Sequence, residues 1–341
     1  MRSLRVAMLC VLLFLLSACG AGLPDDQASG LAPDEGHRLT VYTSHKEEVY
    51  GPIVKEFEER TGIWVQVITG GTNELLERIA AEADMPVCDV MFGGGVESLM
   101  TYGDCFEPYT CSDADLLKPD LRPEGDRWTP FSSLPVVLIY NTKLVAEGAV
   151  TGWADLLDSR WRGRIAFADP AVSGSSYTAM ATMLSCLSGE DWTILKRFAE
   201  NLDGTVLEDS GDVVAAVNVG TASLGVTLEQ TALKQRAQGA DIAIVYPREG
   251  TSNLPDGTAL VAGAPHGENA RAFLEFTQSR DVQELVVNDF ARRSVRVDVA
   301  DRDSMPPESE VCFIDYDVVW ASELAQELLE RWAALFQEEA P

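Results

Sequence analysis

Short segments rich in serine, threonine and glycine recur along the chain where a strand-like run gives way to a helical pattern. Their backbone N–H groups and hydroxyls are hydrogen-bond donors, and a helix N-terminus adds a partial positive charge, so together they suit an anion. The alternative for any one segment is that its serine or threonine only caps the following helix. The segments are Thr43-Ser44-His45, Thr69-Gly70-Gly71-Thr72, Gly93-Gly94-Gly95, Ser173-Gly174-Ser175-Ser176, Ser210-Gly211-Asp212 and Thr227-Leu228-Glu229.

The chain lacks the usual sequence patterns of catalysis and nucleotide binding. GxxxxGKS/T is absent, as are GxSxG and a GxGxxG at a strand–helix junction. Ser173-Gly174-Ser175 lacks flanking glycines, and none of the three histidines (His37, His45 and His266) is evidently placed as its base. The sequence therefore offers no candidate catalytic residues and no motif for a cofactor.

The elements that hold these segments follow a regular order in the first part of the chain. Strand-like runs at 39–42, 63–68 and 89–92 each precede a helical pattern, at 47–60, 73–83 and from 96. Strand, loop and helix repeated in this way predict a parallel α/β sheet, whose ligands bind at the carboxyl ends of the strands.

A second block of the same kind follows, and the two predict a two-lobed α/β fold in which helices flank a mostly parallel sheet in each lobe. Strands at 165–168, 222–226 and 242–246 alternate with helices. Residues 128–140, with Pro130 and Pro135, are expected to form an extended crossover. We expect lobe 1 to span 38–132 plus 250–341 and lobe 2 to span 138–246, with hinge segments near 133–140 and 246–256.

The first residues are typical of an export signal. Arg2 and Arg5 precede the apolar run 7–16, which is too short for a permanent membrane helix. Leu16-Ser17-Ala18-Cys19 resembles the lipobox of bacterial lipoproteins, which implies that 1–18 is a signal peptide and that Cys19 is acylated. Residues 19–37 would then be a lipidated tether on the outer side of the cytoplasmic membrane. The alternative is an ordinary signal peptide with Cys19 incidental.

Net charge and cysteine content limit the classes of binding partner and the disulfides that we expect. The net charge of −28 argues against nucleic acid, whose binding needs clustered lysine and arginine, and against docking on anionic lipid. Five cysteines remain besides Cys10 and Cys19, and an oxidising compartment permits disulfides between them. The short spacing of Cys105 and Cys111 makes them the best candidate pair.

Several segments, in order, resemble the solute-binding proteins of bacterial ABC importers, in the branch that holds ferric-ion-, organophosphate- and phosphonate-binding members. The resemblance implies a type 2 periplasmic-binding-protein fold that closes over one ligand without catalysis, and permease subunits as partners. The segments are LTVYTSHKEEVYGPIVKEFEERTGIWVQV, GGTNELL, DVMFGGG, ADPAVSGSSYTA, the surroundings of Gly225-Val226-Thr227, VYPREGTSNLPDGTALV and ARRSVRVDV.

The resemblance implies two kinds of ligand. His45 matches an iron-coordinating histidine of the ferric members, but the matching loops lack their glutamate and tyrosine pair, which leaves a poor Fe³⁺ site. Tyr42, Tyr177 and Tyr246 could in principle supply phenolate ligands, and the alternative is that they are packed aromatic side chains. The anion site is better preserved, and we expect it to need no cationic side chain. The expected binding residues are Ser44, His45, Gly71, Thr72, Gly94, Ser173, Gly174, Ser175, Ser176, Asp212, Thr227 and Glu229, the last as acceptor for ligand hydroxyls or an amine.

We therefore expect a monomeric, lipid-anchored receptor that captures a small anion, such as a sugar phosphate or phosphonate, for an ABC importer. A ferric-iron receptor with non-standard ligands is the alternative in the same class. An extracytoplasmic hydrolase, or a sensor subunit for a membrane kinase, is the alternative from other classes.

Overall fold

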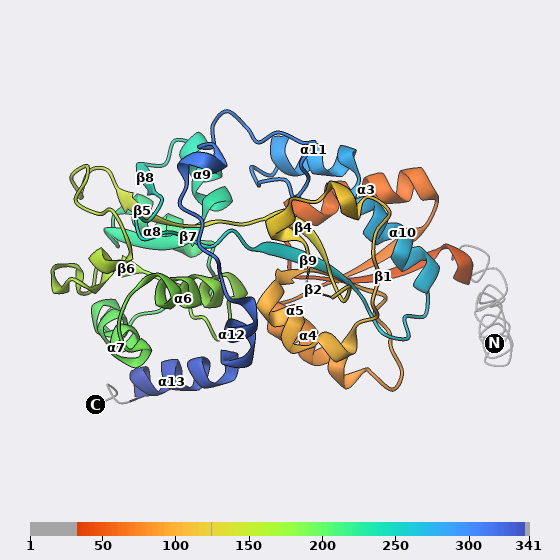
Figure 1. Ribbon diagram of the computed structural model, residues 1–341, viewed down its shortest axis with the longest axis horizontal. Coiled ribbons are helices and arrows are strands. Elements are labelled where there is room, and N and C mark those ends of the chain that lie inside the picture. Colours follow the sequence, from red (N-terminus) through yellow and green to blue (C-terminus); the bar gives the residue numbers. More distant parts are fainter. Residues whose placement is uncertain (1–32, 124, 338–341) are drawn as a thin grey trace, which may run out of the picture.

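Two α/β lobes lie side by side in the computed structural model, which describes residues 33–123 and 125–337 (Figure 1). The first lobe holds a five-stranded sheet in the order β2-β1-β3-β9-β4. β1 pairs in parallel with β2 and β3, while β9 runs antiparallel between β3 and β4. Its strands are β1 (Arg38–Thr43), β2 (Trp64–Thr69), β3 (Val90–Gly95), β4 (Thr129–Ser133) and β9 (Pro255–Leu260). Its helices are α3 (Glu47–Thr61), α4 (Thr72–Ala81), α5 (Val96–Thr101), α10 (Gly267–Gln278) and α11 (Arg280–Asn288).

The second lobe holds a four-stranded sheet in the order β6-β7-β5-β8. β6 and β7 are parallel, and β5 runs antiparallel to both β7 and β8. Its strands are β5 (Val136–Asn141), β6 (Ile165–Ala166), β7 (Leu224–Leu228) and β8 (Ile242–Val245). Its helices are α6 (Gly174–Cys186), α7 (Asp191–Leu202), α8 (Asp212–Val219) and α9 (Glu229–Ala237). The two-lobed α/β class expected from the sequence is thus confirmed, with one strand in each sheet running against the others.

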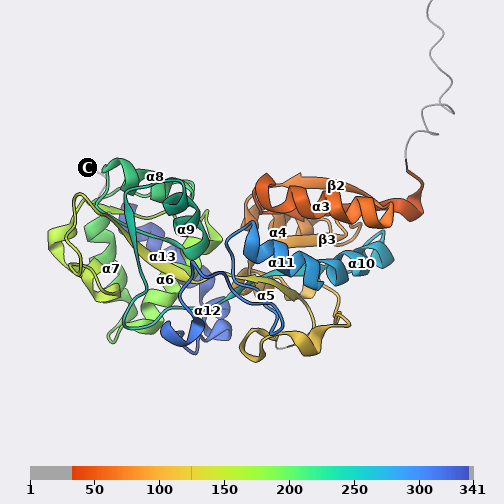
Figure 2. The ribbon, with the colours of Figure 1, turned by 90° about the horizontal axis from the view of Figure 1, so that it is seen from above.

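The chain passes between the two sheets at Leu134-Pro135 and returns between β8 and β9. Both crossings lie within the predicted hinge segments, and Figure 2 shows the connecting segments in the waist between the lobes. The expected crossover over 128–140 is wrong in extent, because most of it forms β4 and β5. Pro130 is tolerated in β4 because that strand is at the edge of its sheet, where a missing N–H breaks no ladder.

The C-terminal helices depart from the expected boundary of lobe 1. α12 (Val318–Glu323) packs on α5 of the first lobe, but α13 (Ala325–Gln337) packs on α7 of the second. Leu328, Trp332 and Leu335 of α13 are buried with Phe167 and Phe198 in the second lobe's core. The chain therefore crosses between the lobes a third time, because the apolar face of α13 completes the core of lobe 2.

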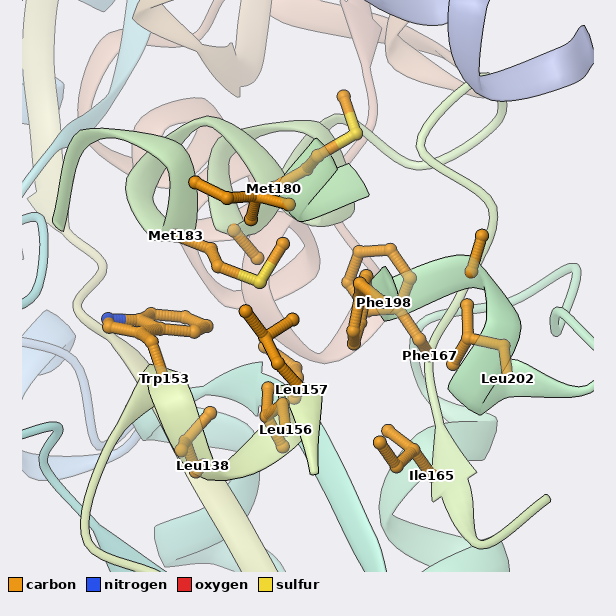
Figure 3. Packing of buried hydrophobic residues seen from close by; sticks show 14 of the residues in the cluster. Leu138, Trp153, Leu156, Leu157, Ile165, Phe167, Met180, Met183, Phe198 and Leu202 are labelled. Atoms are coloured by element: carbon orange, nitrogen blue, oxygen red, sulfur yellow. The ribbon is translucent and has the colours of Figure 1, made fainter. Parts of the chain in front are cut away.

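Each lobe has its own apolar core. Figure 3 shows that of the second lobe, where Met180 and Met183 of α6 lie over Trp153 and Leu156. Helices of the first lobe cover both faces of its sheet, since Leu39 and Val41 of β1 point into one cluster and Tyr42 into another. No helix within 33–123 and 125–337 is long and apolar enough to cross a membrane. The predicted signal peptide and Cys19 lie outside these described residues.

Candidate binding cleft

A cavity of about 730 Å³ lies between the lobes, where loops that follow strands of both sheets meet. Its wall includes the ends of β1, β2 and β3 from the first lobe and the N-terminus of α6 from the second. Eight of the twelve residues expected from the sequence lie in this wall. They are Ser44, His45, Gly71, Thr72, Gly94, Ser173, Gly174 and Ser175.

The N-termini of α4 and α6 face each other across the cavity. Thr72 Oγ1 at the start of α4 lies 3.7 Å from where a Cβ on Gly174 would be. Ser173 caps α6 by accepting from the Ser176 N–H. The first-turn amides of Thr72 and Asn73, and of Gly174 and Ser175, make no hydrogen bond among the described residues, as expected at helix starts. Two sets of N–H donors and their dipoles are thus directed into one space, where an anion would satisfy them.

Gly94 leaves the space that the Thr72 side chain occupies. It has φ +100°, and a Cβ at this position would lie 2.8 Å from Thr72 Cγ2. A larger residue would be strained and would displace Thr72. Gly93–Gly95 was expected as a loop after the third strand, but it forms the end of β3, with a register shift between Phe92 and Gly95.

Arg292, which no sequence pattern indicates, is a buried cation in the cavity wall. Its side chain is 6% exposed. Its Nη1 donates to Asp256 Oδ2 at 2.7 Å and to Ser132 Oγ at 3.1 Å, and its Nε is buried without a partner. Burial lowers the pKa of Arg292 and raises that of Asp256, while their attraction opposes both shifts. The cavity wall therefore contains a buried cationic side chain, which the expected set of neutral donors did not include.

His45 lies beside this pair, packed against Phe92 and Phe131. Burial, and then the charge of Arg292, holds the pKa of His45 well below its usual range. His45 Nε2 is 3.5 Å from Asp256 Oδ2, within ion-pair distance, but its geometry makes no hydrogen bond. We therefore take His45 to be uncharged, because its imidazole is buried next to the Arg292 guanidinium.

Two ion pairs join the lobes at residues that line the cavity. Lys46 Nζ of the first lobe lies 2.9 Å from Asp209 Oδ2 of the second. In the second pair the lysine comes from the second lobe, and Lys234 Nζ of α9 lies 2.8 Å from Glu48 Oε1 of α3. Lys46 lowers the pKa of Asp209, and Lys234 lowers that of Glu48. Because each pair takes one member from each lobe, both require the lobes to be close together.

The other four expected residues lie outside the cavity wall. Ser176 and Thr227 are buried in lobe 2, and Asp212 begins α8 at the surface. Glu229 is 1% exposed, and its two carboxylate oxygens accept from Arg293 Nε and Nη2, both at 2.8 Å. Tyr246 also donates to Glu229. The expected role of Glu229 as acceptor for a ligand is replaced by an ion pair within the protein.

The oxygen donors that Fe³⁺ prefers do not gather in this cavity. Tyr42 donates to Glu82, Tyr177 to the Ala321 carbonyl and Tyr246 to Glu229, and none of the three lines the wall. Among the described residues, no group of three or more histidine, cysteine or acidic side chains could hold a metal ion. Since the carboxylates Asp256, Glu48 and Asp209 are already paired with cations, the donor set fits an anion better than a ferric ion.

Two α/β lobes with a polar cleft at the strand ends define a two-lobed solute-binding protein. Residues 39–289 match the family described as bacterial extracellular solute-binding protein, and the chain belongs to that family. It is 27% identical over 79% of its length to iron uptake protein A1 of Synechocystis sp., covering 78% of that protein. It is 25% identical over 72% of its length to a putative 2-aminoethylphosphonate-binding periplasmic protein of Salmonella paratyphi A, covering 74% of it.

Solved structures show the same fold. The periplasmic binding protein AfuA from Actinobacillus pleuropneumoniae, with exogenous fructose-6-phosphate bound, aligns with a TM-score of 0.81 at 23% identity. The alignment covers 88% of this chain and 98% of AfuA. The resemblance to solute-binding proteins stated from the sequence motifs is thereby confirmed.

Proposed function

We propose that the protein captures a small anionic solute, of the sugar phosphate or phosphonate kind, and delivers it to the permease subunits of an ABC importer. The observation that carries this proposal is the convergence of two helix N-termini and the buried Arg292 guanidinium on one cavity. Unpaired N–H groups, hydroxyls and a partly paired guanidinium supply the donors that phosphate oxygens accept. The fructose-6-phosphate of AfuA and the name of the Salmonella relative agree with such a ligand class.

A binding screen tests the ligand class. Fructose 6-phosphate, 2-aminoethylphosphonate and ferric citrate are each added to the purified protein, and the melting temperature is measured. A tight anion should raise it by several degrees through mass action, whereas the parent sugar without phosphate should not. If ferric citrate alone stabilises the protein and produces a visible colour that a chelator bleaches, the iron alternative replaces this proposal.

Two conservative variants test the donors. Thr72→Val and Ser175→Ala each remove one hydroxyl from the wall, and we expect each to weaken anion binding roughly ten-fold, the effect of about 1 to 1.5 kcal/mol. Ser185→Ala on the same helix α6, whose Oγ donates to the Ala181 carbonyl, is the matched control. Calorimetric affinities that are the same for all three variants would overturn the assignment of these hydroxyls.

We further propose that acylation of Cys19 anchors the chain to the outer side of the cytoplasmic membrane, and that the protein acts as a monomer. The export-type N-terminus and family membership support an extracytoplasmic position. Cys19→Ser should release the protein from the membrane fraction into the soluble extract. Hydrolysis of phosphate esters by the purified protein would instead favour the hydrolase alternative. Binding of the closed form to a membrane kinase would favour the sensor alternative.

A further inference from the structure

The five cysteines among the described residues are all free thiols, including the expected pair Cys105 and Cys111. These two pack into different clusters. Cys111 belongs to the core beside Leu39 and Val41, and Cys105 contacts the core around Tyr42. Leu39 and Val41 project from one face of the sheet, and Tyr42 projects from the opposite face. The two thiols therefore lie on opposite sides of the sheet. The expected Cys105–Cys111 disulfide is therefore wrong.

Two other cysteines, far apart in sequence, meet at Gly250 in the segment between β8 and β9. Cys186 is the last residue of α6, and its Sγ lies 3.2 Å from the Gly250 carbonyl oxygen. Cys312 Sγ lies 3.4 Å from where a Cβ on the same glycine would be. The Cys312 carbonyl accepts from the Thr251 N–H at 2.9 Å, which fixes the Cys312 backbone against this segment.

The two thiols also differ in a way that suits stepwise oxidation. Cys312 is exposed and Cys186 is half-buried. Burial, followed by the charges of Glu249 and Cys312, raises the pKa of Cys186 to about 12. Cys186 is therefore a poor first nucleophile, while the exposed Cys312 is open to an oxidant in solution.

We propose that Cys186 and Cys312 form a disulfide in the exported protein. The Cys312 thiolate attacks an organic disulfide, such as that of a thiol oxidoreductase or oxidised glutathione, and one thiol leaves. Cys186 then loses its proton, attacks the mixed disulfide and releases the second thiol. Two protons and two electrons leave the protein pair, and the donor disulfide is reduced to two thiols. An extracytoplasmic compartment keeps such a bond oxidised.

The bond would attach the segment around Cys312 to helix α6 of the second lobe. Phe313, next to Cys312, forms a β-bridge with Thr251 in the segment between β8 and β9, and the chain then runs on to α12 and α13. α6, at the other end of the bond, starts at the cavity. A disulfide here closes a long loop of chain, which restricts the unfolded state strongly, while both ends stay near the second lobe. We therefore expect a gain in stability with little change in solute affinity.

Peptide mapping of the exported full-length protein under non-reducing conditions tests the proposal. After incubation with oxidised glutathione and alkylation of remaining thiols, we expect one cross-linked peptide that joins Cys186 to Cys312. Cys88, Cys105 and Cys111 should carry the alkyl label. Recovery of Cys186 and Cys312 in alkylated form, or either of them linked to a different cysteine, would overturn the proposal.

Thermal unfolding supplies a second readout. Dithiothreitol should lower the melting temperature of the wild type by about 5 °C, as loss of a long-loop disulfide in a chain of this size predicts. Cys312→Ser should melt at the reduced value and should not respond to dithiothreitol. Cys105→Ser, the matched control, should keep the wild-type response. If Cys312→Ser does not fold, the peptide map of the wild type still decides.

Discussion

Arg292 Nη1 lies 2.7 Å from Asp256 Oδ2 in the wall of the cleft, and both side chains are almost completely buried. The pair therefore has a structural role and, in the proposed function, a role in binding the solute. A buried guanidinium is costly without its carboxylate, and the same carboxylate fixes the guanidinium where it borders the cavity. An anionic solute would accept from the part of Arg292 that Asp256 and Ser132 do not use.

Arg292→Lys should weaken the binding of a phosphate ester roughly ten- to a hundred-fold, the effect of about 1.5 to 3 kcal/mol from a charge-assisted hydrogen bond. The lysine keeps the charge next to Asp256 but loses the planar fork of donors. Arg296→Lys is the control, because Arg296 is equally buried but pairs with Asp298 and Asp113 outside the cavity. Calorimetry should show weaker binding only for Arg292→Lys, and equal loss in both variants would contradict the assignment.

Lys46→Glu should weaken solute affinity by at most about five-fold, because exposed ion pairs contribute roughly 0.2 to 1 kcal/mol. The substitution places like charges across the two lobes at Asp209 and should favour the open cleft. The charge swap Lys46→Asp with Asp209→Lys should restore most of the affinity. Lys55→Glu is the control, since Lys55 pairs with Glu59 within α3. The difference should fall as salt is raised from 50 to 500 mM, and a salt-independent effect would argue against an ion pair.

The two ion pairs between the lobes, Lys46–Asp209 and Lys234–Glu48, should break only at low pH. The pKa values of Asp209 and Glu48 are lowered by their lysine partners, from ordinary values of 3.8 and 4.5. A carboxyl with a depressed pKa contributes above its ordinary pKa and loses its contribution as pH falls through the lower folded value. Small-angle scattering of the solute-free protein should therefore be constant between pH 7 and 5, with opening below about pH 4. Opening between pH 7 and 6 would point to another group.

His266 should make the first lobe more stable at acid than at alkaline pH. Its ring Nδ1 lies 2.9 Å from Asp89 and its Nε2 lies 3.4 Å from Glu35. Burial acts to lower the pKa of His266, but the hydrogen bonds and charges of Asp89 and Glu35 raise it above 6.5. The contribution is full below pH 6.5 and is lost as pH rises through the folded pKa.

The comparison of wild type with His266→Gln measures this contribution. The melting temperature of the variant should be lower by on the order of 2 °C at pH 6, as about 1 kcal/mol predicts for a chain of this size. The difference should shrink by pH 9. A difference that is the same at both values would show that the imidazole acts through packing alone.

Glu229→Gln should destabilise the protein without removing its binding site. The substitution removes one of the two carboxylates that pair with the fully buried Arg293, while Asp301 stays 3.0 Å from its Nη1. We therefore expect a loss at the lower end for a broken buried pair, about 3 kcal/mol in the free energy of unfolding. Urea denaturation measures this loss. Solute affinity at low temperature should stay within about two-fold of wild type, because Glu229 does not line the cavity. Lost binding at unchanged stability would restore the role expected from the sequence.

The sequence alone predicted the parts of the fold and site that depend on local patterns. The alternation of strands and helices follows from side-chain periodicity over a few residues, and Ser44, Thr72 and Ser173 follow from their position after strands. In an α/β sheet these positions meet at one edge whatever the details of packing. Seven of the eight expected residues in the cavity wall follow a strand in this way, and Gly94 lies at the end of β3 itself.

Only the tertiary structure decided which charged and sulfur-containing side chains take part. Arg292 and Arg293 are adjacent in sequence, yet one borders the cavity with Asp256 and the other pairs with Glu229. In an extended segment, neighbouring side chains point in opposite directions, and their partners lie 36 and 64 residues away. The same holds for Cys186 and Cys312 at Gly250, and for α13 on the second lobe. Burial of a charge, a thiol or an apolar face depends on segments that the local pattern does not bring together.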